Sequence, residues 1–169
     1  NPSPVIQEDG SVMMIFKGRA HTENGKYSDM ALGIAYAPNI EGPYTVLNND
    51  QPIFQVDGQG EAEDPFLWKD FKGYHAIFKD HVAKYTGERG GGVMAHSTDG
   101  VHWTVDKDPK AYSRAVEWED GKVEMQGQLE RPFLFFENGK ATHAFFATMD
   151  GPGGFENATK SWNMVIPLK

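Results

Sequence analysis

Short runs of apolar and aromatic residues alternate with tight turns along the whole chain of 169 residues. Glycine follows aspartate or asparagine in the turns, at Asp9-Gly10, Asn24-Gly25, Asp99-Gly100, Asp120-Gly121 and Asn138-Gly139. Such dipeptides between apolar runs are typical of β-hairpins, because both residue types tolerate positive φ. No stretch sustains the periodicity of an amphipathic helix. The pattern therefore predicts an all-β chain of short antiparallel strands.

One hairpin pattern occurs three times, in residues 1–18, 63–80 and 130–148. Each copy has a proline near its start, an apolar strand, a glycine-containing turn and a second apolar strand, which ends at Phe16, Phe78 or Phe146. A second piece repeats without a gap, GIAYAPNIEGPYT at 33–45 and GVMAHSTDGVHWT at 92–104. A unit of two hairpins that recurs about every 60 residues predicts a β-propeller built from four-stranded antiparallel blades.

The repeat divides a single domain, 1–169, into three expected blades at about 1–60, 61–126 and 127–169. Three blades do not close a ring, because propellers have at least about four. The chain also begins at Asn1-Pro2 without a methionine and runs almost at once into a strand pattern. We therefore expect the sequence to be part of a longer propeller. An open β-sandwich would produce the same turns and is the alternative fold.

The net charge of the chain indicates which classes of partner it is expected to bind. The chain has 16 basic and 24 acidic residues and a net charge of −8, which repels phosphate backbones and anionic lipid surfaces. No apolar stretch approaches the roughly 20 residues of a membrane span, and no signal-peptide pattern opens the chain. We expect neither nucleic acid nor membrane as a partner, and a neutral or cationic ligand fits best. The absence of cysteine excludes disulfides but does not indicate a compartment.

Acidic residues recur at the start of the repeated strand. The aligned triplets are Pro2-Ser3-Pro4, Glu63-Asp64-Pro65 and Glu130-Arg131-Pro132. Because the first strand of each blade lines the central channel, we expect Asp64 and Glu130 to meet at one mouth of the propeller. Two carboxylates that share a pocket suit glycoside hydrolysis, in which one donates a proton and the other acts in its ionised form. Arg131 could tune these groups or hold a sugar hydroxyl.

Four further features are candidates on weaker grounds. Glu63 adjoins Asp64, but strand alternation predicts that it points to the opposite side. His81 opens a glycine-rich loop and is a candidate sugar contact, while Trp68 and Trp118 are candidates for stacking on a sugar face. No histidine pair has the spacing of a zinc site, and we expect no metal and no cofactor. Ser97-Thr98-Asp99-Gly100 is interpreted as structural, with Asp99 capping a turn and Trp103 packing between blades.

These residues resemble a known group of enzymes. The segment AEDPFLWKDFKGYHAIFKD is similar to the aspartate-proline strand of the five-bladed propeller glycosidases, glycoside hydrolase family 43 and its relatives, including families 32 and 117. LERPFLFFENGK resembles the blade of those enzymes that carries a glutamate, and NPSPVIQEDGSVMMIFKGR resembles the entry strand of another blade. The resemblance covers the whole chain at the level of the blade pattern.

The resemblance implies the C-terminal three blades of a five-bladed glycosidase that acts on a plant or algal glycan or oligosaccharide. By this resemblance Asp64 orients the substrate and modulates pKa, and Glu130 is the general acid. The aspartate that serves as base in the first blade has no counterpart here, since Asn1 is not an acid. Missing N-terminal blades or a second chain would then supply it. Arg131 departs from the small residue common in family 43, and the resemblance favours a secreted or periplasmic location.

Two other functions remain open on the sequence alone. The chain could be a non-catalytic carbohydrate-binding propeller, whose acids and aromatic residues hold sugar hydroxyls and faces. It could also be a purely structural or interaction domain. A pocket that unites Asp64 with Glu130 would argue against the structural alternative, and an acid supplied to that pocket by preceding sequence or by another chain would favour the enzyme.

Overall fold

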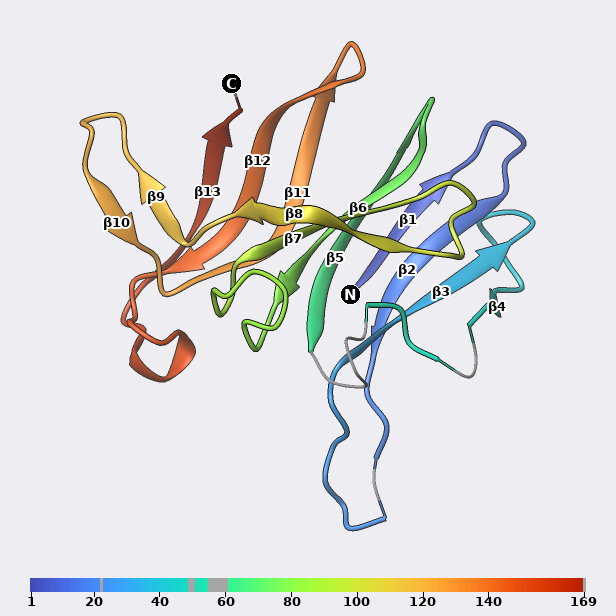
Figure 1. Ribbon diagram of the computed structural model, residues 1–169, viewed down its shortest axis with the longest axis horizontal. Helices are drawn as coiled ribbons and strands as arrows, with labels where there is room; N and C mark the ends of the chain where they lie inside the picture. The colour runs from blue at the N-terminus through green and yellow to red at the C-terminus, as the bar shows by residue number, and fades with distance from the viewer. Residues whose placement is uncertain (22, 49–50, 55–60, 169) are drawn as a thin grey trace.

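Three antiparallel sheets follow one another along the chain in the computed structural model, which describes residues 1–21, 23–48, 51–54 and 61–168 (Figure 1). The first sheet pairs β1 (Pro2–Ile6), β2 (Val12–Gly18), β3 (Ala31–Ala37) and β4 (Thr45–Val46) in that order. The second pairs β5 (Ala62–Asp70), β6 (Gly73–Asp80), β7 (Gly92–Ser97) and β8 (Thr104–Tyr112). The third pairs β11 (Gln128–Glu137), β12 (Lys140–Met149) and β13 (Ser161–Pro167).

The third sheet departs from the repeat, because it pairs three strands instead of four. A separate two-stranded hairpin, β9 (Ala115–Glu117) and β10 (Val123–Met125), precedes it, and one turn of 3-10 helix, Phe155–Asn157, lies between β12 and β13. The blade boundary expected near residue 60 lies outside the described residues. Within the described ranges, no helix is long and apolar enough to cross a membrane.

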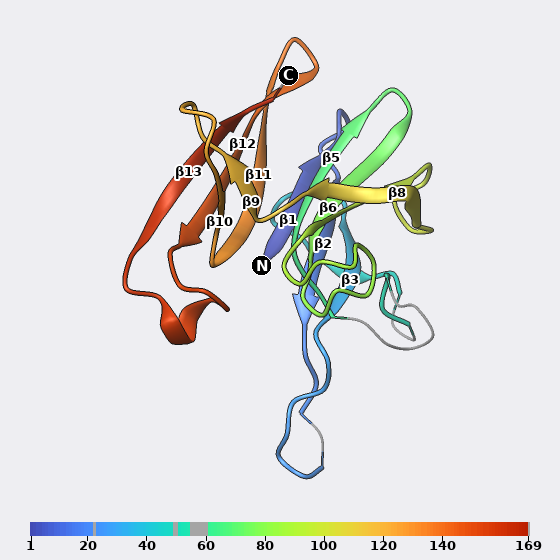
Figure 2. The ribbon, with the colours of Figure 1, turned by 60° about the vertical axis from the view of Figure 1, so that its left-hand side comes forward.

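The first strands of the three sheets lie next to one another. β5 contacts β1 on one side and β11 on the other, and all three run in the same sense (Figure 1). The sheets therefore fan out from these strands, as a view turned by 60° also shows (Figure 2). Neighbouring strands within each sheet are joined by hairpins in sequence order. This arrangement confirms the predicted all-β propeller fold with antiparallel blades.

Alternating apolar side chains fill the space between the sheets. Between the first two sheets, Ile15, Leu32 and Ile34 pack with Phe78 and are fully buried. Burying side chains of this size stabilises the fold by about 2 kcal/mol each. A second core, which includes Leu129, Ala144, Phe146 and Met164, lies against the third sheet. Packing of neighbouring sheets therefore fixes the relative positions of their first strands.

A β-bulge interrupts the first strand of both the second and the third sheet. The pairing register shifts between Glu63 and Phe66 in β5, and between Glu130 and Phe133 in β11. Asp64 and Arg131 occupy the two bulges with positive φ, 50° and 53°. Each of them precedes a proline, which cannot donate to the strand ladder and so favours an irregular position. The bulges turn the side chains at the start of both strands away from simple alternation.

The predicted cap on the turn after β7 is confirmed. Asp99 Oδ1 accepts hydrogen bonds from the backbone N–H groups of Val101 and His102, both at 2.8 Å. Trp103 donates from its indole nitrogen to the Gly100 carbonyl at 3.0 Å and packs against the core between the first two sheets. These residues hold the turn and take no part in the site described next.

Candidate functional site

A chain of alternating lysine and glutamate side chains crosses all three sheets at the starts of their first strands. Lys17 Nζ in β2 lies 2.6 Å from Glu63 Oε1 in β5. Lys79 Nζ in β6 lies 2.9 Å from Glu63 Oε2 and 2.7 Å from Glu130 Oε1 in β11. Each lysine directly follows the phenylalanine that ends a repeated hairpin, Phe16 or Phe78. The repeat therefore places a lysine of the first sheet and a lysine of the second sheet each against the glutamate of the next sheet.

Lys79 is the most enclosed member of this chain, with 3% of its side chain exposed. Burial alone would lower the pKa of Lys79, but the hydrogen bond to Glu130 and the charges of both glutamates raise the pKa overall. The ammonium group is therefore charged and compensates two carboxylates in a confined space. A cation in this position keeps two acids close together without requiring both to be protonated.

Asp64 and Glu130 lie next to each other, although only Glu130 lines the pocket that opens here. Asp64 is 2% exposed, and its Oδ2 accepts a hydrogen bond from the backbone N–H of Arg131 at 3.0 Å. Its Oδ1 accepts a hydrogen bond from the side-chain amide of Asn1. Burial raises the pKa of Glu130, and the neighbouring Asp64 carboxyl raises it further, against the opposing effect of Lys79. Two acids from different sheets thus lie side by side in different environments.

Glu63 and His81 form the other side of this cluster. His81 Nδ1 lies 3.3 Å from Glu63 Oε2, and its Nε2 lies 3.5 Å from Glu61 Oε2. The His81 contact, followed by the ion pairs with Lys17 and Lys79, holds the pKa of Glu63 well below its usual range although burial opposes this. Glu63 reaches the same ammonium group as Glu130, so the prediction from strand alternation that it points away from the site was wrong. The β-bulge after Glu63 is the reason.

A pocket of about 410 Å³ opens beside Glu130. Its walls come from the starts of β11 and β13, the end of β12 and the 3-10 turn, and comprise Glu130, Arg131, Ala147, Thr148, Met149, Phe155, Ser161, Trp162 and Asn163. Phe155 and Trp162 are 71% and 36% exposed. Ala147 pairs in register with Glu130 on the neighbouring strand. The pocket thus offers an acid, a guanidinium, the polar side chains of Thr148, Ser161 and Asn163, and two aromatic faces.

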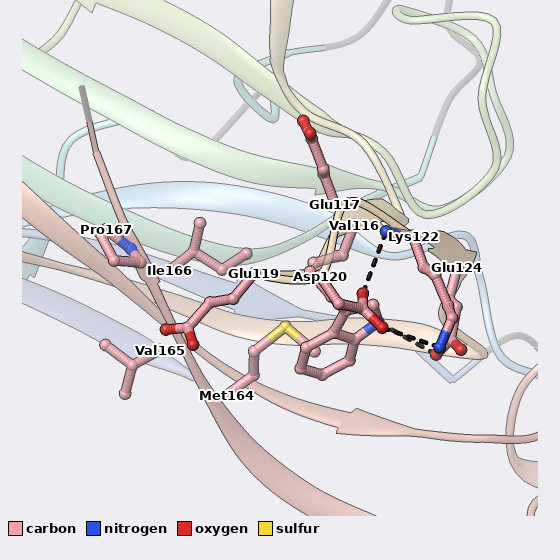
Figure 3. A pocket seen from close by; sticks show the side chains of 11 residues that line it. Val116, Glu117, Glu119, Asp120, Lys122, Glu124, Met164, Val165, Ile166 and Pro167 are labelled. Carbon is pink, nitrogen blue, oxygen red and sulfur yellow. Dashed lines mark hydrogen bonds and ion pairs between the residues drawn. The ribbon is translucent and has the colours of Figure 1, made fainter.

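The two tryptophans singled out in the sequence lie elsewhere. Trp68 packs between the second and third sheets, stacked on His75 at 5.2 Å between ring centroids and near Phe136 at 6.0 Å. Trp118 donates from its indole nitrogen to Glu124 and lines a separate groove between the β9–β10 hairpin and the far end of β13 (Figure 3). Neither lines the pocket beside Glu130.

Sequence reasoning missed Lys79 and Trp162. Lys79 had a usable signal, since Lys17 and Lys79 occupy the same place in two copies of the repeat. Trp162 had none, because a tryptophan in an apolar strand is more often part of a core. Within the described residues, no group of three or more histidine, cysteine or acidic side chains is arranged to hold a metal ion.

Comparison with known proteins gives a fold but no family. No family model matches the chain, and no curated protein matches it. Among solved structures, one described as a glycoside hydrolase and another described as a complex of BT0996 and RGII each match the whole chain, with a TM-score of 0.63 and 12% identity. A mutant of the Bombyx mori family 32 β-fructofuranosidase BmSUC1, in complex with sucrose, matches 97% of the chain with a TM-score of 0.55 and 15% identity.

The chain spans less than half of these solved proteins, 45% of the first two and 32% of the β-fructofuranosidase. At such low identity the likeness concerns the fold. The chain therefore has the fold of propeller glycoside hydrolases, as the resemblance of its strand motifs implied.

Proposed function

We propose that this chain is the acid-bearing part of a glycoside hydrolase with a five-bladed propeller, related to families 43, 32 and 117. Residues 1–169 would form three of the five blades, and the missing N-terminal blades or a second chain would complete the ring. The observation that carries the proposal is the raised pKa of Glu130, which results from its burial and from the neighbouring Asp64 carboxyl. A raised pKa is what a general acid in glycoside cleavage requires, because it helps the carboxyl group to hold the proton that it donates to the leaving oxygen.

In this proposal Glu130 donates its proton to the glycosidic oxygen as the bond to the leaving sugar breaks. Asp64, held by the Arg131 N–H, keeps the proton on Glu130 before cleavage and orients the substrate. Lys79 stabilises the carboxylate that Glu130 becomes once it has given up its proton. Glu63 and His81 are held together by their mutual contact and would form the far side of the substrate site.

An ionised base or nucleophile must act on the opposite face of the sugar. Glu63, the other acid of the cluster, is already engaged by Lys17 and Lys79. We therefore assign the base to the completing blades or the second chain. A separation of about 6.5–9.5 Å between base and Glu130 would give inversion, and one of about 5–5.5 Å would give retention.

The general-acid role predicts a dependence on the leaving group. With the full-length gene product, Glu130→Gln should lower kcat/KM on an oligosaccharide by about a thousandfold, because the poor leaving group needs a proton. The same variant should lower kcat/KM on a dinitrophenyl glycoside by less than about tenfold, because dinitrophenolate leaves without protonation. Equal losses on both substrates, or none, would overturn the assignment of Glu130.

A non-catalytic carbohydrate-binding propeller is the second candidate. The observation that favours it is the set of acids in the cluster, where Glu63 is neutralised by lysines and Asn1 stands at the start of the first sheet beside Asp64. Sugar binding by the full-length product without release of any reducing sugar would support this candidate over the enzyme.

A further inference from the structure

We propose that the pocket beside Glu130 binds a sugar that carries a carboxylate, a uronic acid residue of a glycan, through the guanidinium of Arg131. The inference rests on the proposed function only in taking a carbohydrate as the ligand. It specifies the chemical class of the sugar, which neither the fold nor the roles of the two acids determine.

Arg131 is available for such a ligand. Its side chain is exposed at the pocket wall, and its guanidinium makes no hydrogen bond or ion pair with any residue in the described ranges. Its backbone N–H is already used by Asp64, and the bulge with φ of 53° fixes the direction in which the side chain leaves β11. A planar guanidinium without an internal partner pairs in bidentate fashion with a carboxylate, which a neutral hydroxyl group cannot match.

The rest of the pocket suits a single sugar ring. Phe155 and Trp162 present exposed aromatic faces, on which the apolar face of a pyranose can stack. Ser161 and Asn163 offer polar groups for ring hydroxyls at the start of β13. The volume of about 410 Å³ leaves room for one sugar and its exocyclic carboxylate.

The charge of the residues that line the pocket beside Glu130 differs from the net charge of the whole chain. The net charge of −8 favours neutral or cationic ligands at long range, but Arg131 and Glu130 are the only charged residues among the described ones that line this pocket. Lys79, which does not line the pocket, already pairs with Glu130 at 2.7 Å. An anion that pairs with Arg131 therefore meets a site with little net negative charge, and contact at this range outweighs screened charges farther away.

The test is a titration of the full-length gene product with D-galacturonate and with D-galactose, followed by calorimetry or by NMR shifts of the Trp162 indole. The two probes differ by the carboxylate alone. We expect galacturonate to bind about tenfold more tightly than galactose, because the added bond is charge-assisted on both sides. Arg131→Gln should remove this preference, so that the two sugars bind with similar affinity, while Gln keeps the backbone N–H to Asp64.

Two further variants make the result specific. Arg89→Gln, an identical change at an exposed residue that does not line the pocket, should leave the preference intact. Trp162→Ala should weaken both sugars and keep their ratio. Equal affinity for the two sugars, no binding of either at millimolar concentration, or a preference that survives Arg131→Gln would overturn the inference. The readout is binding, so loss of hydrolysis in Glu130→Gln tests the proposed function separately.

Discussion

Lys79 Nζ lies 2.7 Å from Glu130 Oε1, and the same ammonium group lies 2.9 Å from Glu63 Oε2. One buried cation therefore joins the first strands of two neighbouring sheets. A buried charge between two acids costs desolvation, which its partners must offset, and removal of the cation takes away the ion-pair partner of Glu130 while Glu63 keeps Lys17.

Replacement of Lys79 tests how much this cation contributes to the stability of the fold. Lys79→Met should lower the free energy of unfolding by about 3 kcal/mol, because it leaves the partly buried Glu130 without its ion-pair partner. Lys17→Met, at the equivalent place in the first sheet, should cost about 1 kcal/mol or less, because Lys17 is 25% exposed and Glu63 keeps Lys79. Urea denaturation of the two variants gives both values. Equal costs would show that Lys79 is no more important than a surface lysine.

The two glutamates should respond to pH in opposite directions. The folded-state pKa of Glu63 lies below its ordinary value of 4.5, so the stability that ionised Glu63 contributes is complete above that pH and is lost as the pH falls. The folded-state pKa of Glu130 lies above 4.5, so its contribution is complete below that pH and is lost as the pH rises through the folded pKa.

Thermal unfolding across this range separates the two effects. Glu63→Gln should flatten the acid side of the Tm profile, and Glu130→Gln should flatten the decline above pH 4.5. The two variants affect different parts of the pH profile because the pKa shifts of Glu63 and Glu130 have opposite signs. Parallel profiles for both variants and the unaltered protein would contradict the assignment.

The loop that carries His81 depends on one buried acid. Asp80 is fully buried, and its carboxylate accepts hydrogen bonds from the backbone N–H groups of Lys84, Tyr85 and Thr86 at 2.8–2.9 Å. Asp80→Ala should lower the free energy of unfolding by about 2 kcal/mol and speed amide exchange at residues 84–86. Asp108→Asn, at an exposed position, is the control and should change neither. Unchanged exchange in Asp80→Ala would mean that the loop is held by other contacts.

Two glycines make room for aromatic rings at equivalent places in the repeat. A Cβ on Gly33 would lie 2.6 Å from Cζ of Phe16, and one on Gly92 would overlap the ring of Tyr112. Gly33→Ala and Gly92→Ala should each destabilise the fold by about 1–3 kcal/mol, as overpacking does. Gly18→Ala, at a site with nothing within 4 Å, should be nearly neutral in the same chemical denaturation series. A neutral Gly92→Ala would show that Tyr112 can move away freely.

Much of the fold could be read from local signals. Asp-Gly and Asn-Gly turns and a recurring proline before an apolar strand specify hairpins within a few residues, so the blade pattern and the pairing of Asp64 with the Glu130 region followed from alignment of the repeats. The three-stranded third sheet could not be predicted, because β9 and β10 pair with each other in a separate hairpin.

The site was harder to predict because it depends on how the sheets pack against one another, which local sequence does not show. Whether an aromatic residue in a strand lines a pocket depends on which sheet packs against it, so Trp68 and Trp162 look alike in sequence but lie in different surroundings. Alternation failed at Glu63 because a bulge is a local irregularity of the backbone. Lys79 was overlooked because its ion pairs with two acids form only when neighbouring sheets pack together.

Ala147 stands where the first two sheets have lysine, directly after the phenylalanine that ends the repeated hairpin, and it pairs with Glu130 and lines the pocket. In the second sheet the corresponding place beside Glu63 is filled by the Lys79 side chain. The small side chain of Ala147 thus leaves open the place beside Glu130 that a lysine fills beside Glu63. A departure from the internal repeat at a single position therefore distinguishes an open pocket from a filled contact between strands.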